Sequence, residues 1–251
     1  MRWRCCASGS PRSERAPGVT RARLAAVCLA ALLAGVVAPA GVRAGAQRYE
    51  PMSAAVRGAL SAMVTADRTP PEPVFTNLQE KVDWLATMSE RLPRRWKPDY
   101  QGRIEFLKTV RYEAMRAGLD PQLVLALIEV ESYFRRYAVS SAGARGYMQV
   151  MPFWSDAIGD GDASKLFDMR TNLRYGCSIL RHYLDLEGGD LFLALGRYNG
   201  SRGRREYPDA VMKAWRRWEF GPPGGGPSIT VPSTTVPAAQ PAPAGSARPP
   251  S

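Results

Sequence analysis

The stretch from Leu127 to Pro152 constrains this chain most, because it joins an amphipathic helix to a loop of small residues. At about 100° per residue, Glu131 falls between Leu127 and Phe134 on an apolar helical face, whereas Glu129 faces elsewhere. A carboxyl group in apolar surroundings resists ionisation, which raises its pKa toward the value that a general acid needs near neutral pH. Glu131 is therefore either a catalytic acid or a structural carboxylate paired with an arginine or lysine.

The loop after this helix has the composition of a ligand-contacting segment. Residues 140–146 combine two glycines with small side chains, so the backbone can approach a bound molecule closely. Residues 147–152 mix apolar side chains with one amide, Gln149, which either hydrogen-bonds a sugar or caps a turn. Tyr198 and Asn199 end a later predicted helix, where they serve either a substrate or a buried Asn-Gly turn.

Several separated elements, in this order, resemble the signature of the soluble lytic transglycosylase family, lysozyme-like enzymes that cut bacterial peptidoglycan. The resemblance covers roughly residues 105–218 of the chain. The matching positions are Glu131-Ser132, Ser140, Gly143-Ala144, Gly146, Met148-Gln149-Val150-Met151-Pro152 and Tyr198-Asn199. The chain departs from the family pattern at Gly200-Ser201, where the family has Ala-Gly, and after Glu206, where Tyr207 and Ala210 replace Thr and Tyr.

The resemblance implies a mainly α, lysozyme-like domain that cleaves the bond between N-acetylmuramic acid and N-acetylglucosamine without water. Glu131 would first protonate the glycosidic oxygen and then, as a carboxylate, accept a proton from the muramyl hydroxymethyl group, which closes a 1,6-anhydro ring. No cofactor and no metal are implied. The residues that would bind the glycan strand are Ser140, Gln149, Met151, Tyr198, Asn199 and Glu206.

Two other functions stand beside this one. A hydrolytic muramidase would let water attack and would need a second carboxylate, such as Glu206 or Asp168, opposite Glu131. A wall-binding or assembly scaffold would keep the fold with little activity, and the altered motif after Glu206 leaves room for it.

The first 46 residues have the composition of a secretory signal peptide. An Arg-rich start precedes the apolar run Leu24–Val37 and a group of small residues, which predicts cleavage after Ala44 or Ala46. The apolar run is short for a membrane span, so an uncleaved anchor is the alternative. We therefore expect a periplasmic or secreted protein.

Composition divides the rest of the chain into three parts. Residues 47–100 are predicted to form a small helical N-terminal extension, whose second helix, 78–92, has apolar spacing at Val82, Leu85 and Met88. Residues 101–220 are predicted to form the lysozyme-like domain, with Met115 as a candidate core position of its first helix and Asp120-Pro121 at the start of the helix that carries Glu131. Pro, Gly, Ala, Ser and Thr dominate residues 221–251, which predicts a disordered tail because such a segment cannot bury a core.

Charge limits the partners that the chain can bind. The formal net charge of +11 falls to about +5 without residues 1–46, which hold seven arginines and one glutamate. No basic run alternates with aromatic residues, so nucleic-acid binding is not expected. A modest positive charge suits glycan strands whose peptide stems carry carboxylates. Cys177, the one cysteine after residue 46, reads as a buried small hydrophobe. An envelope-spanning assembly as partner and the oligomeric state stay open.

Overall fold

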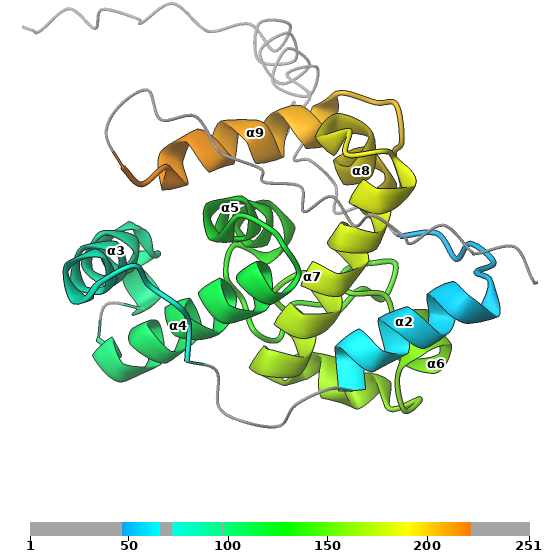
Figure 1. Cartoon of the computed structure of the whole chain (residues 1–251), viewed down its shortest axis with the longest axis horizontal. Coiled ribbons are helices and arrows are strands. Elements are labelled where there is room, and N and C mark those ends of the chain that lie inside the picture. Colours follow the sequence, from blue (N-terminus) through cyan, green and yellow to red (C-terminus); the bar gives the residue numbers. More distant parts are fainter. Residues whose placement is uncertain (1–46, 66–71, 97, 222–251) are drawn as a thin grey trace, which may run out of the picture. The chain divides into compact units, whose positions relative to one another are not determined.

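The computed structural model describes residues 47–65, 72–96 and 98–221, whose regular structure is helical apart from isolated β-bridges (Figure 1). The predicted mainly α fold is therefore confirmed. The predicted signal peptide and residues 222–251 of the predicted tail lie outside the described residues. The elements are α2 (Ala54–Thr65), α3 (Leu78–Arg91), η1 (Arg94–Trp96), α4 (Tyr100–Arg116), α5 (Pro121–Ser132), α6 (Phe153–Ile158), η2 (Ala163–Phe167), α7 (Met169–Leu186), α8 (Leu191–Tyr198) and α9 (Glu206–Trp218).

Helix α5 packs against α4 and α9, and it lies between them in Figure 1. Its start is the one that the sequence predicts, because the Asp120 side chain accepts hydrogen bonds from the amides of Gln122 and Leu123, and Pro121 occupies the first turn. At its other end Tyr133 adopts a left-handed conformation with φ 50°. The chain therefore turns sharply into the loop directly after the last helical turn.

Two glycines let this loop lie directly on α7. A Cβ on Gly146, which has φ +76°, would lie 2.3 Å from the Asn172 Nδ2 atom. A Cβ on Gly176 would lie 2.3 Å from the Met148 sulfur. Because neither position tolerates a side chain, the loop backbone can come close enough for the Met148 amide to donate to Asn172 Oδ1 at 2.8 Å.

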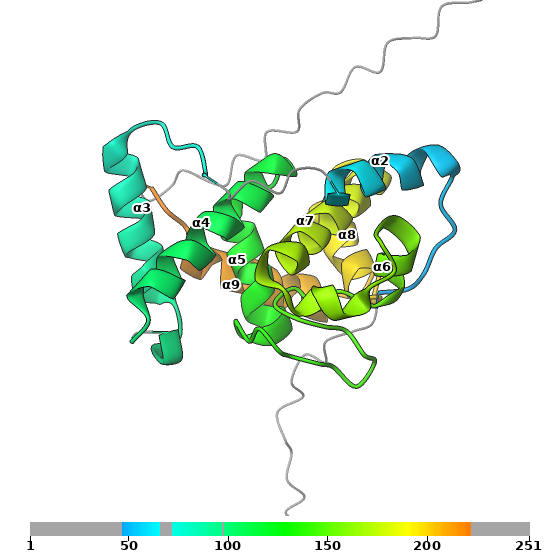
Figure 2. The ribbon, with the colours of Figure 1, turned by 90° about the horizontal axis from the view of Figure 1, so that it is seen from below.

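The two α-helices of the predicted N-terminal extension pack on the rest of the described chain, with α2 against α6 and α7, and α3 against α4 (Figure 2). In α3 the predicted buried positions Leu85 and Met88 are buried, but Val82 is 54% exposed. Trp84 is fully buried instead, with the Arg111 guanidinium 5.2 Å from its ring centre. None of the described helices combines the length and apolar character needed to cross a membrane.

Helix α4 contributes both apolar and ionic contacts to the core. Met115 was predicted to be buried but is exposed, because Val110 and Ala114, four residues apart, form the buried face. On the same helix Glu113 is fully buried, and its carboxylate accepts from Arg174 of α7 at 3.0 Å. The two helices are therefore joined by a buried ion pair as well as by apolar packing.

Candidate active site

Glu131 lies in the last turn of α5, 9% exposed, and accepts a hydrogen bond of 2.5 Å from the Tyr207 hydroxyl. Burial raises the pKa of Glu131 from 4.5 to about 8, and the bond from Tyr207 opposes this increase. The carboxyl group is therefore mostly neutral at pH 7. The next residue, Ser132, fixes the helix end to the loop, because its hydroxyl donates to the Tyr147 carbonyl at 2.7 Å.

Glu129 occupies a different environment, as its position on the helix predicts. Its two carboxylate oxygens accept from Arg217 and from the Trp218 indole at 2.5 and 2.6 Å. Within the described part of the chain, Glu131 forms no such ion pair, which removes the main support for a purely structural role. The two glutamates therefore do not act as a pair.

Tyr207 was missed by sequence reasoning, which treated it as a replacement of the family's Thr. It is buried in the first turn of α9 on the same face as Val211 and Trp215, and this face packs on α5. The spacing of four residues between these positions was the available signal. Glu206, one position earlier, is exposed, and its proposed contact with the glycan stays a prediction.

The loop uses two of the predicted glycan-binding side chains to hold its own shape. Gln149 is 4% exposed with φ 49°, and its Nε2 donates to the carbonyls of Ala138 and Gly146 at 3.2 and 3.0 Å. The Ser140 hydroxyl accepts from the Ala144 amide at 3.1 Å. The loop therefore presents a fixed backbone surface next to α5, and the sugar contacts of these two residues stay predictions.

Tyr198 and Asn199 at the end of α8 are buried close to the loop and to Glu131. The Tyr198 hydroxyl donates to the Met148 carbonyl at 2.7 Å, so the phenol does not bond Glu131 directly. Burial raises the pKa of Tyr198 well above 10, and the nearby Glu131 carboxyl raises it further. The Asn199 amide donates to the Ser201 hydroxyl at 2.9 Å. Glu131, Tyr198 and Tyr207 are thus brought together from three helices.

Comparison with known proteins finds a family match in this part of the chain. Residues 108–214, which contain Glu131, Tyr198 and Tyr207, match the family model of the transglycosylase SLT domain. The chain carries an SLT domain. Its resemblance to the lysozyme-like lytic transglycosylases is therefore confirmed.

Curated relatives are similar to part of the chain. A transglycosylase of Enterobacteria phage PRD1 is 31% identical over 119 residues, 45% of this chain and 43% of the relative. The membrane-bound lytic murein transglycosylase C of Actinobacillus pleuropneumoniae is 40% identical over 93 residues, 37% of this chain and 24% of the relative. That of Mannheimia succiniciproducens is 36% identical over 84 residues, 30% of this chain and 24% of the relative. The chain spans less than half the length of each of these relatives.

A residue from outside the SLT domain reaches its loop. Gln47 is 4% exposed, and its Oε1 accepts from the Met151 amide at 3.2 Å and from the Trp154 indole at 3.1 Å. Its Nε2 donates to the Gln149 carbonyl at 3.4 Å. The Gln47 side chain thus bonds main-chain groups of Gln149 and Met151, two residues that were predicted to bind the sugar. The sequence offered no motif that would have identified it.

The SLT domain offers no cluster for a metal ion among the residues that the structure describes. No group of three or more His, Cys, Asp or Glu side chains is placed there to hold one. Cys177 is buried in α7, and burial raises the pKa of its thiol, which agrees with the predicted role as a small apolar residue.

Proposed function

We propose that the protein is a peptidoglycan lytic transglycosylase with Glu131 as its single acid and base. The observation that carries this proposal is the environment of Glu131: burial raises the pKa of its carboxyl to about 8, with a phenol as hydrogen-bond partner. Such a group holds a proton at neutral pH and can deliver it to a leaving oxygen.

The reaction needs two proton transfers at this carboxyl. Glu131 first donates its proton to the glycosidic oxygen, the bond from that oxygen to C1 of the muramyl residue breaks, and N-acetylglucosamine leaves with a free hydroxyl. The Glu131 carboxylate then takes the proton of the muramyl C6 hydroxyl while that oxygen attacks C1. Tyr207 donates to the carboxylate between the two steps, because a charge-assisted hydrogen bond is stronger than a neutral one.

The hydrolytic alternative has less support. A glycosidase with two carboxylates holds them roughly 5–10 Å apart. Glu129 is bonded to Arg217 and Trp218, and Asp168 caps α7 by accepting from the Thr171 amide. Glu206 is exposed in the first turn of α9, where nothing fixes its carboxylate against Glu131 among the described contacts. We therefore favour ring closure by the substrate's own hydroxyl over attack by water.

The proposal also includes the residues that contact the glycan and the compartment in which the protein acts. We assign sugar contacts to Ser140, Gln149, Met151, Tyr198 and Asn199, with Glu206 at the edge. The support is that Tyr198 lies near enough to Glu131 for the carboxyl to raise its pKa, and that its hydroxyl donates to the Met148 carbonyl of the loop. The Met151 amide of the same loop already holds one side-chain amide, that of Gln47. Because the substrate lies outside the cytoplasm, the proposal includes export by the predicted signal peptide to a periplasmic or secreted location.

The test is mass spectrometry of the soluble products after the protein digests purified peptidoglycan, with Glu131→Gln in parallel. The variant keeps the shape of the side chain and removes the transferable proton. We expect 1,6-anhydromuramyl ends from the wild-type protein and none from the variant. Reducing ends would identify a hydrolase, and an absence of products from the wild-type protein would favour the binding scaffold.

A further inference from the structure

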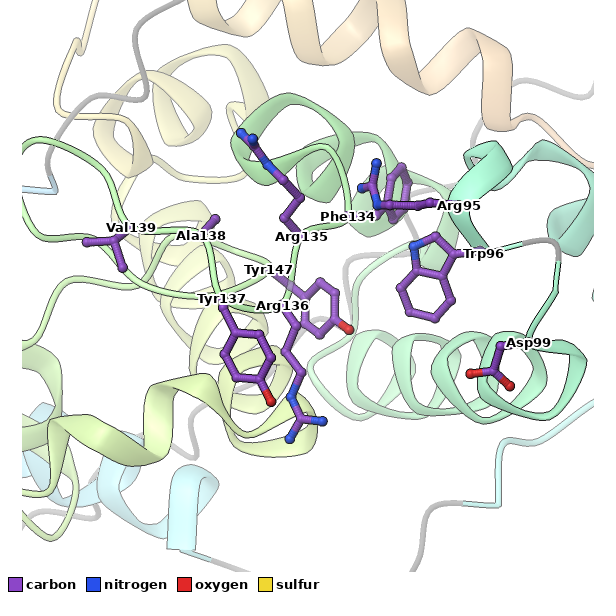
Figure 3. A pocket seen from close by; sticks show the side chains of 10 residues that line it. All are labelled: Arg95, Trp96, Asp99, Phe134, Arg135, Arg136, Tyr137, Ala138, Val139 and Tyr147. Atoms are coloured by element: carbon purple, nitrogen blue, oxygen red, sulfur yellow. The ribbon is translucent and has the colours of Figure 1, made fainter.

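A pocket of about 630 Å³ lies where the chain leaves α5 and meets the segment before α4 (Figure 3). Its volume falls in the range of sites that bind small molecules. Glu131 is not among its lining residues, so the pocket is separate from the buried carboxyl. The lining residues are Arg95, Trp96, Asp99, Phe134, Arg135, Arg136, Tyr137, Ala138, Val139 and Tyr147.

The pocket is positively charged. Three of its described lining residues are exposed arginines, and its one acidic residue, Asp99, already accepts from the Gly102 amide at 2.7 Å as the cap of α4. We call Arg95, Arg135 and Arg136 the arginine rim. Guanidinium groups favour carboxylates because two N–H groups can bond one carboxylate in parallel.

The arginine rim is held in place mainly by contacts with neutral groups of the described chain. Arg95 lies 5.1 Å from the centre of the Tyr133 ring, and the Arg135 Nε donates to the Ser132 carbonyl at 3.0 Å. Arg136 donates to a carbonyl of η2, and its ion-pair contact with Asp168 is a loose one of 3.9 Å. Because ring faces and carbonyls are neutral, the rim keeps a net attraction for anions.

The floor of the pocket is aromatic. Trp96 and Tyr147 pack together with ring centres 6.3 Å apart, and in Figure 3 Arg95 and Arg136 lie on opposite sides of this pair. Both rings also pack against Phe106, whose ring centre lies 4.9 Å from that of Trp96 and 5.0 Å from that of Tyr147. An apolar floor under a cationic rim fits a short peptide with small apolar side chains and several carboxylates.

The pocket lies within reach of a substrate held at Glu131. Arg135 and Arg136 follow Glu131 by four and five residues, so their Cα atoms lie within about 18 Å of its Cα, given at most ~3.6 Å per residue. A peptide of a few residues spans a similar distance. A stem attached to the muramyl residue can therefore enter the pocket while the glycan occupies the site.

We propose that the arginine rim binds the carboxylates of the peptide stem on the glycan strand that Glu131 cleaves. The proposal rests on the proposed function and adds a preference that the buried carboxyl alone does not supply. The enzyme would act faster on glycan that carries its stems than on bare glycan strands.

The test compares two double variants on two substrates. Arg95→Gln/Arg136→Gln removes two charges from the rim, and Arg57→Gln/Arg216→Gln removes two exposed arginines of α2 and α9 as a matched control. The substrates are intact peptidoglycan and the same glycan strands after an amidase has removed the stems. The rate at which anhydro ends are released gives kcat/KM for each protein on each substrate.

We expect the rim variant to lose tenfold or more in kcat/KM on intact peptidoglycan, since each lost charge-assisted bond costs roughly that factor. On bare strands it should match the wild-type protein, as the control variant should on both substrates. An equal loss on both substrates would overturn the proposal, because the rim would then serve the fold or the sugar. Unchanged activity on intact peptidoglycan would overturn it too.

A binding measurement tests this proposal independently of the proposed function, because it does not require the protein to cleave glycan. Titration of a free stem peptide, followed by calorimetry, should show at least tenfold weaker binding to the rim variant than to the wild-type protein, even if the wild-type protein releases no anhydro ends. Equal binding of the peptide by both proteins would refute a carboxylate site here. So would rim-dependent binding to vesicles of anionic lipid without any binding of the peptide, which would assign the rim to a membrane surface.

Discussion

Replacing Glu131 with glutamine should stabilise the protein while abolishing its activity. The folded state holds this carboxyl where it is 9% exposed, and burial raises its pKa to about 8. An unfolded chain solvates the same group, whose pKa then returns to about 4.5. Between these two values the folded state binds a proton that the unfolded state has released, so the free energy of unfolding falls as pH rises.

The size of this effect follows from the difference between the two pKa values. Each pH unit between 4.5 and about 8 corresponds to about 1.4 kcal/mol, so the loss reaches at most about 5 kcal/mol at pH 8 and above. The contribution of the Glu131 proton to the free energy of unfolding is fully retained below pH 4.5 and is lost as pH rises through the folded-state pKa of about 8. The amide of Glu131→Gln does not titrate, and its oxygen can still accept from Tyr207. The variant should therefore gain stability relative to the wild-type protein as pH rises.

Urea unfolding of both proteins at a series of pH values from 4 to 9 measures this difference. Glu105→Gln, an exposed position on α4, is the matched control and should follow the wild-type curve. We expect the advantage of Glu131→Gln to grow by several kcal/mol between pH 4.5 and 8 and then to level off. Parallel curves for Glu131→Gln and the wild-type protein would refute the reasoning, because the carboxyl would then be as well solvated in the folded state as in the unfolded chain.

Three further perturbations test separate contacts. Tyr207→Phe removes the hydrogen bond that lowers the Glu131 pKa, so the pH at which kcat/KM falls should rise by roughly half to one pH unit. An unchanged pH profile would contradict this. Gln47→Ala frees the Met151 amide and the Gln149 carbonyl, which belong to two residues that we assign to the sugar, so KM for glycan should fall by about two- to tenfold at constant kcat, whereas a rise in KM would make Gln47 a support of the loop. Glu113→Gln leaves Arg174 buried without its counter-charge, which should cost about 3–5 kcal/mol in urea unfolding; a cost under about 1 kcal/mol would show that the pair is solvated.

Local sequence was enough to predict the helix that carries the acid. Asp120 and Pro121 predicted where α5 begins, and the apolar neighbours of Glu131 predicted a raised pKa for its carboxyl. Both depend on residues within a few turns of one helix, where a period of 3.6 fixes which side chains share a face. The opposite direction of Glu129 followed from the same geometry and is confirmed.

Which face of a helix is exposed was harder to predict where packing against another segment determines it. Val82 follows the apolar spacing of α3, yet it is exposed, and Trp84 is buried instead. Phe75, from the segment before α3, lies 6.0 Å from the Trp84 ring and covers it. Nothing within α3 indicates that a preceding segment folds back over this side, so a pattern taken from one helix selected the wrong position.

The partners of the candidate acid lie far away in sequence, and this is where sequence reasoning ended. Tyr207 bonds Glu131 across 76 residues, and Gln47 reaches the loop from 102 residues away. Helix α5 supplies an apolar stripe on its own, but a stripe on an isolated helix would be solvated and would leave the pKa of its glutamate near 4.5. Packing of α9 on α5 excludes water from the carboxyl and also provides its one hydrogen-bond donor among the described residues. The chemistry that we assign to Glu131 is therefore a property of the contact between two helices, and a change on α9 should alter the acid as strongly as a change beside it on α5.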